Sequence, residues 1–88
     1  MTAMLEIVET VYHQEYRNHV YQFRDVKGRG IYVSRVPKEH QLWFHGVIHQ
    51  MLNSNEQEFK PAARSGIIMP FETLEAAVKA AFEVADSE

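Results

Sequence analysis

The chain has 88 residues, of which 45% are hydrophobic and 24% are charged, and its formal net charge is −3. This composition is typical of a folded globular protein, excludes a disordered chain, and at this length predicts a single domain over residues 1–88. The sequence contains no cysteine, which excludes a disulfide framework and a thiolate zinc site. No apolar run approaches the roughly 20 residues that span a bilayer, and the N-terminal stretch MTAMLEIVET does not resemble a secretory signal. We therefore expect a cytoplasmic protein without membrane contact.

Residues 4–16 are compatible with either a helix or a strand. One reading places their apolar residues on a helical stripe, and the other alternates Leu5, Ile7 and Val11 as in a strand. The density of isoleucine, valine, threonine and tyrosine between residues 7 and 12 favours the strand. Arg17 and Asn18 are then expected to turn the chain into a second strand.

The stretch VYQFRDVKGRGIYVSR, residues 20–35, predicts a β-hairpin. Aromatic and β-branched residues flank a tip at residues 27–30, whose two glycines permit the positive φ angles of a tight turn. Pairing residue 25 with residue 31 places four apolar side chains on one face: Tyr21, Phe23, Ile31 and Val33. Pairing residue 26 with residue 31 would give a less apolar face, so we expect the first register.

The stretch VPKEHQLWFHGVIHQMLNSN, residues 36–55, is predicted to contain a helix. Pro37 suits a first helical turn, and the polar residues 53–55 suit its end. The apolar side of this helix would carry Phe44, Val47, Ile48 and Met51. Gly46 weakens a helix by about 1 kcal/mol, and LWFHGVI is also compatible with a strand, but the helix is favoured.

The C-terminal part predicts a short buried strand and a second helix. Residues 67–69 form an apolar run that Pro70 must end, because proline cannot donate to a central ladder. Thr73 is a natural N-cap. Apolar residues then recur at the helical period: Leu74, Ala77, Val78, Ala81, Phe82 and Ala85. The complete pattern predicts an α+β fold in the order β-β-β-α-β-α, a small antiparallel sheet of three to four strands with two helices packed on one face.

Basic residues concentrate in the first half of this acidic chain. Six lie between residues 17 and 38, against one acid. Four of them belong to the predicted hairpin, residues 24–35, and form a candidate nucleic-acid surface: Arg24, Lys27, Arg29 and Arg35. The positions at which the RNA-recognition sheet motif carries aromatic rings hold Arg29, Ile31 and Ser34, which cannot supply ring stacking on bases. The hairpin is therefore expected to contact phosphates without reading bases.

Histidines are the next candidates for chemistry. His45 and His49 have the spacing of a metal pair on a helix, with His40 upstream. The position between them that a metalloprotease fills with glutamate holds glycine, and no third ligand is evident. No nucleophile elbow or phosphate loop occurs. We expect no metal, no cofactor and no catalytic residue, and the enzymatic alternative is a small hydrolase that uses a histidine pair such as His13 and His19.

Trp43 is the candidate anchor for a protein partner. It adjoins Phe44, so a helix cannot bury both rings equally, and with His40 and Val47 it would form a partly exposed patch. The function that the sequence favours is a small non-catalytic protein-interaction module of a bacterial or phage accessory type, acting as a homodimer. Phosphate-backbone binding through the basic hairpin is the first alternative.

Overall fold

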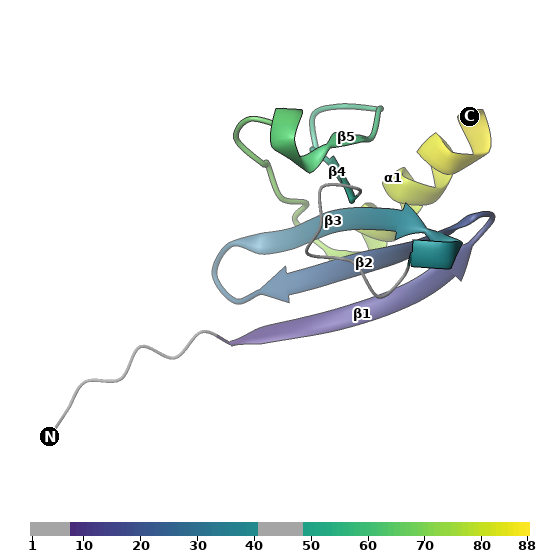
Figure 1. The fold of residues 1–88 in the computed structure, drawn as a ribbon. Helices are drawn as coiled ribbons and strands as arrows, with labels where there is room; N and C mark the ends of the chain where they lie inside the picture. The colour runs from purple at the N-terminus through teal and green to yellow at the C-terminus, as the bar shows by residue number, and fades with distance from the viewer. Residues whose placement is uncertain (1–7, 41–48) are drawn as a thin grey trace, which may run out of the picture.

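The computed structural model describes residues 8–40 and 49–88. These residues form one antiparallel sheet of five strands and one C-terminal α-helix, which confirms the predicted α+β class (Figure 1). The strands are β1 (Glu9–Tyr16), β2 (His19–Val26), β3 (Gly30–Pro37), β4 (Gln50–Leu52) and β5 (Lys60–Pro61). They lie side by side in chain order. The helix is α1 (Leu74–Ser87), and two short 3-10 helices are η1 (Lys38–His40) and η2 (Ala62–Arg64).

The structure corrects the predicted number of strands and the middle helix. In the described residues there are five strands rather than three to four, and one α-helix where two were predicted. Residues 50–52 form β4, so the predicted helix is wrong at its C-terminal end. At its start only the short 3-10 helix η1 forms, over residues 38–40, and residues 41–48 lie outside the described residues. Strand β4 forms because pairing Leu52 with Val33 of β3 buries the leucine side chain completely in the core.

The first three strands follow the predicted turns and register. Within the ambiguous segment 4–16, residues 9–16 form strand β1, and residues 4–7 lie outside the described residues. Arg17 has a φ of 55° in the turn that leads to β2. Asp25 pairs with Ile31, which is the expected register of the hairpin. Tyr21, Phe23, Ile31 and Val33 are accordingly all buried on one face.

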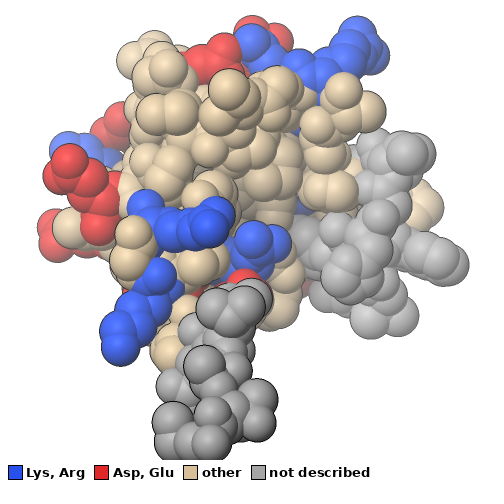
Figure 2. Space-filling view, turned by 90° about the vertical axis from the view of Figure 1, so that its left-hand side faces the viewer, with Lys and Arg blue, Asp and Glu red and all other residues tan. Residues whose placement is uncertain are grey.

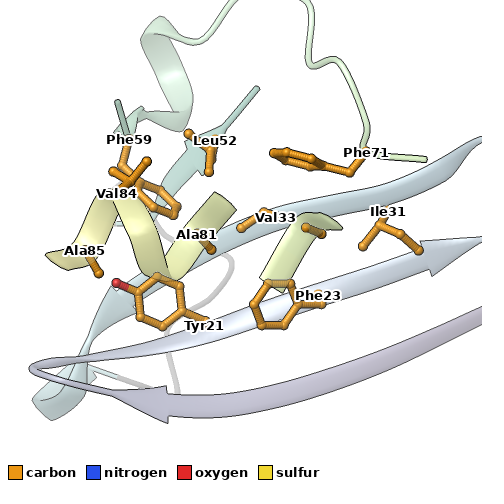
Figure 3. Close-up of a cluster of buried hydrophobic side chains, with 11 residues drawn as sticks. Tyr21, Phe23, Ile31, Val33, Leu52, Phe59, Phe71, Ala81, Val84 and Ala85 are labelled. Atoms are coloured by element: carbon orange, nitrogen blue, oxygen red, sulfur yellow. The ribbon is translucent and has the colours of Figure 1, made fainter. Parts of the chain in front are cut away.

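Helix α1 covers this face and completes the core. The Thr73 hydroxyl accepts a hydrogen bond of 3.1 Å from the Ala76 N–H, which is the predicted N-cap. Small buried residues on α1 bring the helix close to β2 and β3. Figure 3 shows the resulting cluster, to which the strands and loops contribute Tyr21, Phe23, Ile31, Val33, Leu52, Phe59 and Phe71. Phe82 is half-buried and packs against this cluster.

The predicted strand at residues 67–69 is wrong. Ile67 is 86% exposed, and the chain meets the sheet only at Phe71, whose backbone makes two hydrogen bonds of 2.8 Å with Ile31. The physical reason is that β4 already occupies the edge of β3 at Val33, so this segment bridges β3 only near its start. The bridge requires Gly30, which has a φ of 125° and at which a Cβ would lie 2.5 Å from the Phe71 carbonyl oxygen.

Candidate functional site: the edge strand β1 and the hairpin tip

Strand β1 is the most exposed regular element of the sheet. Seven of its eight residues are exposed, and it forms the margin of the sheet opposite β4 and β5 (Figure 1). The exposed residues include large apolar side chains at and just before the strand: Val8 (48%), Val11 (39%) and Tyr12 (43%). A strand that buries so little on either face gains stability mainly from its backbone pairing with β2.

The outer edge of β1 presents backbone groups to solvent. The Lys27 N–H donates to the Val8 carbonyl at 3.0 Å, which fixes the phase of hydrogen bonding between β1 and β2. Because bonding pairs alternate in an antiparallel ladder, the even-numbered residues of β1 bond to β2. The odd-numbered residues, among them Glu9, Val11 and Glu15, direct their N–H and C=O groups away from it. In the described part of the chain, no other strand pairs with this edge.

Proteins usually protect an edge strand with lysine, proline, a bulge or a short length. Strand β1, of sequence ETVYHQEY, has no proline, lysine or glycine, and its eight residues pair with β2 in an uninterrupted register. Only the acidic residues Glu9 and Glu15 place formal charge on it at neutral pH. The edge is therefore long, regular and able to receive a further strand.

The end of β1 next to α1 is firmly attached. The Tyr16 ring stacks on Phe82 at 4.1 Å between centroids, and its hydroxyl donates to the Asp86 carboxylate at 2.7 Å. The Arg17 guanidinium also donates to Asp86 at 2.7 Å. These two hydrogen bonds hold the pKa of Asp86 below its usual value, Tyr16 contributing the larger effect. The strand is thus positioned by α1 at one end and exposed along the rest of its length.

Three of the predicted phosphate-binding residues do lie together at the hairpin tip. Arg24, Lys27 and Arg29 line a shallow hollow of about 450 Å³. Figure 2 faces the side of the molecule on which the β2–β3 turn lies, and basic groups gather there beside uncharged surface. Arg24 lies 3.5 Å from Glu9 and 5.6 Å from the centre of the Tyr32 ring, so part of its charge is already compensated.

A second hollow, of about 350 Å³, continues from the first along the sheet face that α1 leaves uncovered. Glu9, Arg24 and Tyr32 line both hollows, and Val11 and Met51 extend the second one. The hollow therefore runs beside β1, where the side chains of an added strand would find both apolar and basic neighbours.

Arg35 does not belong to the hairpin surface, which corrects the prediction. It pairs with Tyr21 in the sheet register and so points into the core face, with its side chain only 5% exposed. Its guanidinium bonds the Glu88 carboxylate at 2.6 and 2.7 Å and the Tyr21 hydroxyl at 3.1 Å, and it lies 4.1 Å from the centre of the Phe59 ring. Buried cations require such partners. The sequence could have indicated this burial. Arg35 lies two residues after Val33 and four after Ile31, so in a strand all three side chains lie on the same face.

The predicted partner patch is described only in part. His40 lies exposed at the end of η1, whereas Trp43 and Val47 lie outside the described residues. The proposed histidine pair is not brought together: His13 shares a sheet face with Gln22, and His19 lies on the opposite face. Burial lowers the pKa of His19. Among the residues that the structure describes, no three histidine or acidic side chains are grouped to hold a metal ion.

The exposed edge itself was not recognised as a site from the sequence. The sequence feature that indicates it is the absence of an apolar face in ETVYHQEY. Polar residues lie on both sides of this strand: Glu9, His13 and Glu15 on one, and Thr10 and Gln14 on the other. A strand that is polar on both sides cannot lie in the middle of a two-layer fold.

Comparisons with family models, with curated proteins and with solved structures returned no match. The helix that the structure describes is too short to cross a bilayer, and no other described helix is long and apolar enough to do so.

Proposed function

We propose that this chain is a non-catalytic protein-interaction module whose docking element is strand β1. The observation that carries the proposal is the eight-residue outer edge of β1, which lies without a described neighbour and without a proline, a lysine or a bulge. A second chain in extended conformation would satisfy the outward N–H and C=O groups of β1 and continue the sheet. Its side chains would cover Val11 on one face and Tyr12 on the other.

The proposed module is an accessory protein rather than an enzyme, and it acts in the cytoplasm. The absence of cysteine supports this compartment, where disulfides are rare. Support for a binding role comes from the contrast within the fold: α1 covers the core face of β2 and β3, whereas Val11 and Tyr12 of β1 remain exposed.

A site-specific photo-cross-linking experiment tests this proposal. Because the chain has no cysteine, Val11→Cys and Ile67→Cys each create one thiol that carries the probe, and Ile67 is the control because it is an exposed apolar residue far from β1 in the chain. We expect the probe at residue 11 to give a discrete adduct with a protein chain, identical or different, that the probe at residue 67 does not give. Identical adducts from the two positions would contradict the proposal.

The adduct is then verified with purified components. Val11→Lys places a charge in the contact and is expected to weaken binding about tenfold or more, whereas Ile67→Lys leaves it unchanged. Unaltered affinity in Val11→Lys would contradict the assignment of β1.

Phosphate-backbone binding at the hairpin tip is the second candidate function. The observation that favours it is the convergence of Arg24, Lys27 and Arg29 on one hollow. Fluorescence anisotropy with random-sequence DNA and RNA oligomers at low and physiological salt tests it. Binding that weakens in Lys27→Ala and Arg29→Ala, but not in the control Lys79→Ala on α1, would support the tip as the site. Absence of binding at low salt would reject this function.

A further inference from the structure

We infer that the chain that adds to β1 is a second copy of this protein, paired antiparallel to β1 about a two-fold axis at Val11. This inference rests on the proposed function, because it identifies the partner of the same edge. The resulting homodimer has one continuous sheet, in which the two β1 strands are central and both α1 helices pack on the same face.

The hydrogen-bond phase of β1 restricts how two copies can pair. Only odd-numbered residues direct their backbone groups outward, so in a symmetric antiparallel pair odd residues must bond to odd residues. The sum of the two paired residue numbers is then always even. The two-fold axis therefore passes at a residue of β1, which lies opposite its own copy, and not midway between two residues. Near the middle of the strand this leaves three registers, centred on Val11, Tyr12 or His13.

Side-chain pairing separates these three registers. With the axis at Tyr12, Glu9 of each copy would lie opposite Glu15 of the other, and like charges directly opposite destabilise a sheet. With the axis at His13, the two His13 rings would face each other and Glu15 would lie opposite Val11. Both arrangements place unfavourable neighbours at the contact.

The register at Val11 pairs complementary side chains on both faces of the sheet. Val11 lies opposite Val11 of the second copy at the axis, and Glu9 lies opposite His13 on either side, a carboxylate beside a ring whose N–H can donate a hydrogen bond to it. On the other face Tyr12 lies opposite Thr10, an aromatic and a β-branched residue. The 39% exposure of Val11 and the 43% exposure of Tyr12 are therefore reduced in one step.

Cysteine scanning tests the register, because the natural chain offers no competing thiol. Residues directly opposite in an antiparallel pair have Cα atoms about 5.5 Å apart, within reach of a disulfide, whereas diagonal neighbours are about 7–8 Å apart. Under oxidation by glutathione we expect Val11→Cys to form a covalent dimer about tenfold faster than Tyr12→Cys or His13→Cys. Fastest cross-linking at residue 12 or 13 would overturn the inferred register.

Sedimentation velocity tests the dimer without cysteine substitutions. We expect the unmodified chain and Ile67→Lys to sediment as dimers and Val11→Lys, which places two cations at the axis, to sediment as a monomer with an unchanged circular dichroism spectrum. If the unmodified chain sediments as a monomer at every concentration, the inference is overturned. If it is monomeric but the residue-11 probe captures a different protein, the dimer is wrong and the proposed docking function stands. If neither partner is found, both are wrong.

Discussion

The two edges of the sheet are built in opposite ways. Strand β5 has two residues, one of which is Pro61, and its Lys60 bonds the Glu56 carboxylate at 2.6 Å before the chain turns into η2. Proline and lysine are the residues that natural proteins use to prevent edge pairing. Strand β1 has eight residues and neither of these. Within the described residues the fold closes one edge and leaves the other open, and this difference is the reason that we propose β1 as the place where a partner strand adds.

The edges also differ in how much of the core they hold. Phe59, next to β5, is buried, and its ring lies 4.1 Å from the Arg35 guanidinium and 5.7 Å from the centre of the Tyr21 ring. Tyr12 of β1 pairs with Phe23 in the ladder but stays exposed. The β5 side therefore contributes to the stability of a single copy, whereas in the proposed dimer the middle of β1 contributes to association.

The largest expected effect comes from removing a ring on each side. Phe59→Ala should lower the free energy of unfolding by about 3–5 kcal/mol, because it leaves a cavity beside a buried guanidinium. Tyr12→Ala should change it by about 0.5 kcal/mol or less, as exposed substitutions usually do. Urea unfolding measures both, in the Val11→Lys background so that association does not contribute. Equal losses would remove the distinction between the two sides of the sheet.

An intermediate effect is expected from two carboxylates at the end of α1. Asp86 in the helix accepts a hydrogen bond from Tyr16 of β1, and Glu88, the residue after the helix, accepts hydrogen bonds from Arg35 of β3. The Arg35 guanidinium holds the pKa of Glu88 below its usual range, and hydrogen bonds from Tyr16 and Arg17 do the same for Asp86. Lowered carboxyl pKa values stabilise the fold fully above about pH 5, and this contribution is lost as the pH falls below about 4. Stability should therefore decrease as the pH falls below about 5. Between pH 5 and 8 these two carboxylates should not change the stability.

Neutral variants separate the two contributions. Glu88→Gln should cost about 1 kcal/mol at pH 7, since Arg35 is 5% exposed but the Glu88 side chain is 44% exposed and hydrated. Asp86→Asn should cost less, because both partners of its ion pair are exposed. Urea midpoints at pH 7 and at about pH 2.5 measure this, and the difference between Glu88→Gln and the unmodified chain should disappear at the lower pH. A difference that persists there would mean that Glu88 acts through packing rather than charge.

Alternation and turn chemistry were sufficient to predict the β1–β2–β3 meander, the register of its hairpin and α1 with its Thr73 cap. These features are local: each depends on neighbours in sequence or on a turn of a few residues. Strand β4 depends instead on the pairing of Leu52 with Val33, which are far apart in the sequence, and β5 forms only by pairing with β4. Patterns within the segments cannot specify such pairings, which explains why residues 50–52 were assigned to a helix. The open edge of β1 also required the strand order, because a strand is an edge only relative to its neighbours.

The smallest expected effect concerns the hairpin tip, which adjoins the start of β1. The tip is attached to β1 by the backbone bond from Lys27 N–H to the Val8 carbonyl, which side-chain truncation leaves in place. Lys27 and Arg29 are exposed, and the turn conformation is set by Gly28 at a φ of 80°. Lys27→Ala and Arg29→Ala should therefore each change the free energy of unfolding by less than about 0.5 kcal/mol. Urea unfolding in the same Val11→Lys background checks this, and a loss several times larger would show that the basic tip helps to hold β1 in the sheet. In that event the edge strand would be secured at both ends, by α1 at Tyr16 and by the hairpin tip at Val8.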